Sequence, residues 1–275
     1  MSKTYNTLIY ESAIIGQMAE RIDQMNQMYL QNYMEKKDNW FSKGLFPITE
    51  RPISKPIKGG ILVIGINPRS DNDEADKFQE ILDKARENGM TPVWDGTDDI
   101  HSDQFTTTDW KLIKPRSLST QSKQGWARYQ AQFNKIWEVL GYPEIKNKMY
   151  AMNWCPFPSA HVDSIPPEIY KYCTAFTKEY IRLSQPKMII SYKNVRDRIG
   201  SEMNWKQANL GKGLNLITKK KNFIQIGTFG NIPAMIMNHP SMNLVSDKSI
   251  PEKNDWAKPH VKELIDYFMR QNAIL

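Results

Sequence analysis

The sequence is poor in cysteine and has no long apolar run, and each shortage excludes a class of protein. Cys155 and Cys173 are the 2 cysteines among 275 residues, too few for a disulfide framework or a four-cysteine metal cage. A reduced, cytoplasmic setting is therefore expected. No apolar stretch is long enough to cross a bilayer, and no signal-like segment is present, so neither a membrane nor secretion is expected. With 40% hydrophobic and 11% aromatic residues, the chain can still form a folded core.

Charge is distributed unevenly along the chain, whose formal net charge is +7. Residues 71–103 are mainly acidic, whereas residues 111–135 contain basic side chains and no acidic one. Residues 187–222 are again mainly basic. Two basic stretches suit a surface that follows a nucleic-acid backbone, but ordinary solvated charge explains such stretches more often. Charge alone leaves both explanations open.

Strand-like and helix-like segments alternate along the chain. Short apolar runs predict buried strands at residues 60–65, 148–153, 187–192, 223–226 and 232–237. Helical spacing of apolar residues predicts helices at residues 8–36, 74–88, 126–140, 166–184, 194–200 and 256–272. The alternation predicts an α/β fold: a three-layer αβα sandwich around a central, mainly parallel sheet of about four to five strands. We expect residues 1–275 to form a single domain, with a helical extension at 1–57 and a long insertion at 70–125.

Three short segments follow predicted strands where those strands end, and each combines a polar side chain with a proline. They are Gly65-Ile66-Asn67-Pro68-Arg69, Asn153-Trp154-Cys155-Pro156-Phe157 and Asn238-His239-Pro240-Ser241. Ligands of open α/β sheets bind at the carboxyl ends of the strands, so these segments form the candidate site. Proline restricts the backbone and so helps to hold the adjacent polar group in place.

The residue types in these segments argue against several kinds of chemistry. No segment contains a carboxylate, so paired-acid glycosidase chemistry is not indicated. The sequence has no nucleophile elbow, no glycine-rich nucleotide loop and no histidine spacing typical of a metal site. Cys155 and Cys173 lie too far apart in the sequence for a paired-thiolate motif. The remaining amides, imidazole and hydroxyl can orient a water molecule and stabilise a departing anion.

Taken together, the three segments resemble the signature motifs of the uracil-DNA glycosylase superfamily. Gly65-Ile66-Asn67-Pro68 is similar to the first motif of the mismatch-specific and single-strand-selective branches, and His239-Pro240-Ser241 is similar to the final motif of most branches. Asn153 matches the base-reading asparagine. The resemblance extends over residues 58–268 as a fold, with residue matches confined to the three loops. It implies a monofunctional DNA glycosylase that flips a base out of DNA, hydrolyses its N-glycosidic bond and leaves an abasic site, with no cofactor and no metal.

The resemblance also implies a role for each matched residue. Asn67 positions the attacking water, and His239 donates a hydrogen bond to the departing base. Asn153 and Ile66 contact the flipped base, on which Phe78 stacks in preference to Trp94 or Phe105. Each residue has an ordinary structural explanation as well: asparagine before proline forms turns, and Phe78 fits helix packing.

Further residues are expected to contact the DNA itself. Pro68, Pro240 and Ser241 lie against flanking phosphates in this interpretation. Met242, Asn243 and Leu244 then form a wedge that enters the duplex and offsets the cost of unstacking the base. The expected partner is DNA, duplex or single-stranded, and the protein is expected to be a monomer.

Arg69 departs from the family pattern, because the similar branches have glycine at this position. An arginine there can bond a polar substituent at the pyrimidine C5 edge, or a phosphate. The final motif also lacks the usual proline after its serine. A 5-modified pyrimidine is therefore favoured over uracil, in base-excision repair or in anti-phage defence. Two alternatives remain open: a non-catalytic nucleic-acid-binding module on the same fold, and a hydrolase of nucleosides or nucleotides.

Overall fold

The computed structural model describes residues 2–35, 40–48, 52–54, 56–66, 75–89, 137, 141–159, 161–209, 224–237, 259–272 and 274. These residues form an α/β fold with a mixed, mostly parallel sheet of 6 strands. The strands are β1 (Ile61–Gly65), β2 (Met149–Asn153), β3 (Met188–Tyr192), β4 (Trp205–Gln207), β5 (Ile224–Phe229) and β6 (Ile232–Met237). Their order across the sheet is β2-β1-β3-β6-β5-β4. The predicted α/β class is confirmed, while the sheet is larger than expected. The chain divides into two compact units. Unit 1 comprises Met1–Pro56, Gly65–Ser102 and Ala151–Gln185, and unit 2 comprises Ile57–Ile64, Asp103–Tyr150 and Pro186–Leu275.

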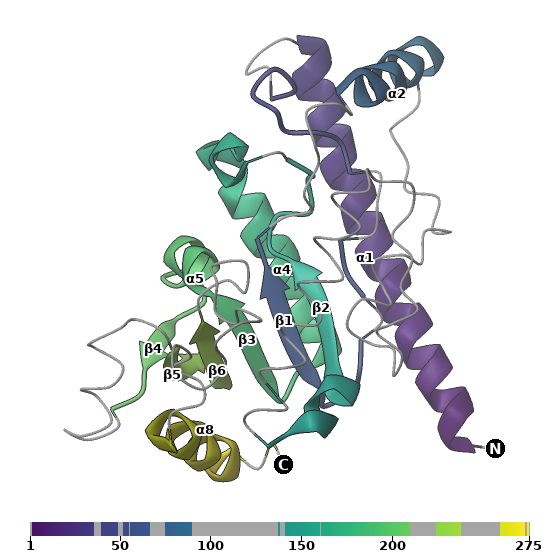
Figure 1. The fold of residues 1–275 in the computed structure, drawn as a ribbon. Helices are drawn as coiled ribbons and strands as arrows, with labels where there is room; N and C mark the ends of the chain where they lie inside the picture. Colours follow the sequence, from purple (N-terminus) through teal and green to yellow (C-terminus); the bar gives the residue numbers. More distant parts are fainter. Residues whose placement is uncertain are drawn as a thin grey trace, which may run out of the picture. The chain divides into compact units, whose positions relative to one another are not determined.

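Unit 2 contains the parallel centre of the sheet. β3 (Met188–Tyr192) lies between β1 (Ile61–Gly65) and β6 (Ile232–Met237) and is parallel to both (Figure 1). All residues of β3 are buried, which explains why its sequence is apolar except at Ser191 and does not alternate with exposed polar residues. β5 (Ile224–Phe229) and β4 (Trp205–Gln207) extend the sheet with antiparallel pairing.

Helices of unit 2 pack through apolar positions. The 3-10 helix η2 (Pro143–Lys148) precedes β2, α5 (Lys193–Ile199) contacts β3 and β6, and α8 (Pro259–Gln271) follows β6 in the chain. Ile265 and Phe268 of α8 are buried, as their helical spacing predicts. The predicted helix at residues 126–140 lies outside the described residues except for Trp137, which is buried.

Unit 1 is built around two helices that pack against each other, α1 (Ser2–Glu35) and α4 (Tyr170–Ser184) (Figure 1). α1 buries a stripe of apolar side chains at helical spacing, which runs through Ile14, Met18, Ile22, Met25 and Tyr29. α2 (Ala75–Asn88) contacts α1. Unit 1 also holds the 3-10 helices η3 (Val162–Ser164) and η4 (Pro167–Ile169), and the end of β2 (Met149–Asn153) from Ala151 on.

The proline-containing segment after α1 is fastened to that helix by buried hydrogen bonds. The Asn26 amide donates to the Ile48 carbonyl over 2.7 Å and accepts from the Ile48 N–H over 2.8 Å. The Tyr29 hydroxyl donates to the Leu45 carbonyl. Each bond satisfies a backbone group that would otherwise be costly to bury. The expected N-terminal extension is thus an integral part of unit 1.

No helix among the described residues is both long enough and apolar enough to cross a bilayer.

Candidate functional site

The exits of β1 and β2 lie side by side in unit 1, at the first two predicted motifs. The N–H of Trp154 donates to the Gly65 carbonyl over 2.9 Å, and the N–H of Cys155 donates to the Ile66 carbonyl over 2.8 Å. The turn that follows β2 therefore holds the last two described residues before Asn67. Two successive anchored carbonyls fix the direction in which the chain leaves β1.

The Asn153 side chain lies directly over Gly65. A Cβ atom at Gly65 would be 2.6 Å from Oδ1 of Asn153, which is closer than van der Waals contact allows. Asn153 itself is half-buried at the end of β2, and its N–H donates to the Pro52 carbonyl over 2.9 Å. The absence of a side chain at Gly65 thus leaves room for a partly exposed amide with a fixed backbone. Spacing alone does not reveal this packing, although a glycine at a strand end is a signal of close approach.

The residues after Asn153 are anchored in the interior of unit 1. Trp154 is fully buried, donates from Nε1 to Oγ1 of Thr174 over 3.2 Å, and meets the Tyr170 ring edge-on at 5.1 Å. Cys155 is also fully buried, and its Sγ donates to the Phe157 carbonyl over 3.8 Å. Residues 153–157 contain no ionisable side chain apart from this thiol. A neutral amide on a rigid turn suits recognition of a polar edge, because it offers both an acceptor and a donor.

The two cysteines interact in the interior of unit 1. Cys155 follows β2 and Cys173 lies on α4, and both side chains are fully buried. Burial, followed by the interaction with Cys155, raises the pKa of the Cys173 thiol. Both are free thiols. A buried thiol with a raised pKa, as at Cys173, is a poor nucleophile.

Unit 2 brings the exits of β1 and β6 to one edge of the sheet. Ile64 is in register with Ser191 of β3, and Ser191 is in register with Ile236 of β6. Because the three strands are parallel, the chain leaves β1 and β6 at the same level, separated by one strand and so by about 10 Å. The third predicted motif follows β6 directly.

Most of the predicted site residues lie outside the described residues: Asn67, Pro68, Arg69, His239, Pro240, Ser241, Met242, Asn243 and Leu244. Ile66 is described and half-buried, and its carbonyl accepts the bond from Cys155. The structure thus brings Ile66 and Asn153 together.

Phe78 is buried in unit 1 and packs against another aromatic ring. The Phe78 side chain is 5% exposed, and its ring stacks on Phe46 with centroids 4.6 Å apart and planes 12° from parallel. Phe46 comes from the segment that is fastened to α1. These contacts favour the helix-packing explanation of Phe78 over stacking on a flipped base. Trp94 and Phe105, the other aromatic candidates, lie outside the described residues.

Metal ligation finds no support in the described part of the chain, where no group of three or more histidine, cysteine or acidic side chains is arranged to hold an ion. A comparison with models of known protein families finds no match, and a search of curated protein sequences finds none either.

Proposed function

We propose that this protein is a monofunctional DNA glycosylase that removes a pyrimidine, preferably one modified at C5, and leaves an abasic site. The observation that carries the proposal is the Asn153 amide, held half-buried over Gly65 at the joined exits of β1 and β2. An amide in this position can accept and donate along the polar edge of one flipped base. The proposal includes a three-layer arrangement like that of the uracil-DNA glycosylase superfamily.

Asn67 and His239 are the proposed catalytic residues, and the described strand ends support their placement. Asn67 follows the anchored carbonyl of Ile66, and His239 follows β6, whose exit is level with that of β1. The carboxyl ends of parallel strands are where open α/β sheets bind ligands. The proposal assigns Asn67, Asn153 and His239 to the recognition and removal of one base.

The chemistry of these groups favours a dissociative hydrolysis. An amide is a weak base, so Asn67 orients water rather than activating it strongly. The N-glycosidic bond therefore breaks first, and its electron pair leaves with the base. His239 stabilises the charge that develops on the base oxygen through a hydrogen bond. Water then adds to the sugar cation at C1′ and loses a proton to solvent, while the departed base gains one.

The modified base is proposed because of Arg69, which follows the first motif. A guanidinium carries several donors in a planar fork and bonds polar substituents well. The basic stretches at residues 111–135 and 187–222 supply charge suited to a DNA backbone. Base-excision repair and defence against phage DNA are both contexts in which such an enzyme acts.

The test is a cleavage assay on two panels of DNA followed by hot alkali, which breaks strands at abasic sites. One panel carries uracil in single and double strands, and the other carries 5-hydroxymethylated and glucosylated cytosine. We expect strand breaks in the second panel with the wild-type protein and none with Asn67→Ala. Breaks confined to the uracil panel would overturn the assignment of a modified base.

Two results would replace the proposal rather than refine it. Tight binding to both panels without breaks would indicate a nucleic-acid-binding module. Release of bases from free nucleosides but not from DNA would indicate a nucleoside hydrolase.

A further inference from the structure

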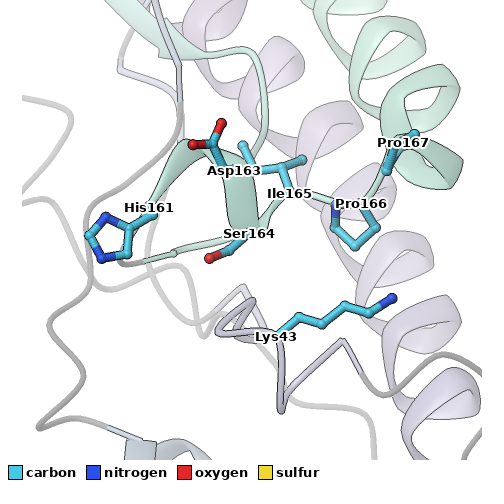
Figure 2. A pocket seen from close by; sticks show the side chains of 7 residues that line it. All are labelled: Lys43, His161, Asp163, Ser164, Ile165, Pro166 and Pro167. Carbon is cyan, nitrogen blue, oxygen red and sulfur yellow. The ribbon is translucent and has the colours of Figure 1, made fainter.

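An open groove of about 570 Å³ in unit 1 does not gather its polar groups around one point. Figure 2 shows the Lys43 side chain directed toward the two prolines of the lining, while His161 lies at the opposite end of the groove. Polar groups of unit 1 do converge at residues 52–54, where they are buried and paired with β2. This short segment bears on the candidate site because β2 carries Asn153 at its end.

Residues 52–54 lie along β2 in the manner of a short antiparallel strand. Ile53 forms an antiparallel bridge with Met152, and the N–H of Asn153 donates to the Pro52 carbonyl over 2.9 Å. β2 is the first strand in the order of the sheet and has β1 on its other side. The end of β2 is therefore held from two sides, by the sheet and by this segment.

Ser54 joins the segment both to β2 and to α4. Its N–H donates to the Ala151 carbonyl over 2.8 Å, while its hydroxyl accepts from the Ala151 N–H over 2.6 Å and donates to the Ala151 carbonyl over 3.1 Å. The Ser54 carbonyl accepts a hydrogen bond from the Tyr180 hydroxyl of α4 over 2.7 Å. Both side chains are buried, so a hydrogen bond lost here leaves a buried polar group without its partner.

We infer that Ser54 and Tyr180 are positioning residues, which hold Asn153 in place for recognition of the flipped base. Tyr180 fixes the segment whose Pro52 carbonyl accepts the Asn153 N–H. On the other side of β2, the Asn153 side chain lies over Gly65. A group that reads a base must be held within about 0.5 Å of its productive geometry by the residues around it. The inference rests on the proposed function in one respect, which is that Asn153 contacts the base.

The first test compares amide hydrogen exchange at the Asn153 N–H, by NMR of the full-length chain, in Tyr180→Phe and in the matched control Tyr29→Phe. Each change removes a buried hydroxyl that donates to a backbone carbonyl, but Tyr29 bonds Leu45, outside residues 52–54. Loss of one buried hydrogen bond corresponds to about a 2- to 13-fold change in an opening equilibrium. We expect Tyr180→Phe to speed this exchange by that factor and Tyr29→Phe to leave it unchanged, once global stability from urea unfolding is taken into account.

The second test measures single-turnover release of a 5-modified base from DNA. Tyr180→Phe should slow release about 2- to 13-fold, and Tyr29→Phe should match wild type. Because Tyr180 acts through Asn153, adding Tyr180→Phe to Asn153→Ala should slow release no further, whereas a general loss of structure would persist. Ser54→Ala removes the hydroxyl bonds to Ala151 and keeps the backbone pairing, so it should give the same pattern even where Tyr180→Phe does not fold.

The inference is overturned if Tyr180→Phe and Ser54→Ala leave Asn153 exchange at the rate of Tyr29→Phe, or if their slower base release persists in Asn153→Ala. A wild-type protein that releases no base from any DNA would overturn the proposed function instead. The exchange comparison would then still decide whether Ser54 and Tyr180 hold Asn153, because it requires neither DNA nor activity.

Discussion

Replacing Gly65 with alanine should separate base recognition from folding. Gly65 is a strand residue and is absent from the glycines with positive φ, so the alanine backbone is compatible with β1. The added Cβ would be 2.6 Å from Oδ1 of Asn153, and the nearest other contacts of that Cβ are at 3.7 Å. The Asn153 amide must therefore turn away, while the strand itself is undisturbed.

Gly65→Ala should change the free energy of unfolding little but slow base excision clearly. Turning one side chain off its preferred rotamer costs about 0.5–1.5 kcal/mol. Replacing glycine at a compatible position returns about 0.4–1 kcal/mol through the unfolded state. The free energy of unfolding should thus change by less than about 1 kcal/mol. A bidentate contact to a base edge contributes about 1–3 kcal/mol, so base excision should slow about 5- to 150-fold.

The assay combines urea unfolding with single-turnover base release for Gly65→Ala, Asn153→Ala and the double variant. Because both changes act through one amide, the double variant should be no slower than Asn153→Ala alone. Gly16→Ala is the matched control: Gly16 is exposed on α1, nothing lies within 4 Å of its added Cβ, and its rate should not change. Wild-type activity in Gly65→Ala would show that the Asn153 amide does not recognise the base, and a loss of activity fully explained by unfolding would contradict the prediction as well.

Three further predictions concern the interior of unit 1. Phe78→Ala should lower the free energy of unfolding by about 3–5 kcal/mol in urea titrations, because the ring is buried and stacks on Phe46. A variant that keeps its stability but binds the base more weakly would instead indicate that Phe78 stacks on the flipped base. Cys155 and Cys173 should resist a thiol reagent in the folded protein and react once urea unfolds it, and rapid native labelling would contradict their burial. Burial, aided by Tyr33, raises the pKa of Tyr29, so the folded phenol stays protonated where the unfolded one ionises. Stability should then be independent of this group below about pH 10 and fall above it by up to about 1.4 kcal/mol per pH unit; a Tyr29→Phe variant with the same alkaline slope would contradict this.

The elements that the sequence predicts best are those whose burial is complete. β3 is buried at every residue and α1 is buried along one stripe, so their apolar patterns are unambiguous. β4 was not predicted because Lys206 and Gln207 of its three residues are exposed, and a short edge strand leaves no periodic pattern. Its pairing with β5 depends on tertiary position rather than on local sequence.

At the candidate site too, features set by neighbouring residues in the sequence can be predicted, whereas contacts between distant residues cannot. The position of Asn153 at a strand end can be predicted from the sequence, because the asparagine directly follows the apolar residues of the strand. The contact of Cys155 with Cys173 cannot, since it depends on how the turn after β2 packs on α4, where Trp154 bonds Thr174. The burial of Phe78 likewise depends on Phe46, which is distant in sequence.

Mass spectrometry of the released product tests directly whether the protein is a DNA glycosylase. Wild-type protein and Asn67→Ala are incubated with DNA that carries one 5-modified cytosine per strand, and both the small molecules and the DNA are weighed. We expect the intact modified base in solution and an abasic strand of matching mass, with wild type only. A DNA strand of unchanged mass, recovered after prolonged incubation with folded wild-type protein across every modified and uracil-containing DNA, would contradict the proposed glycosylase activity.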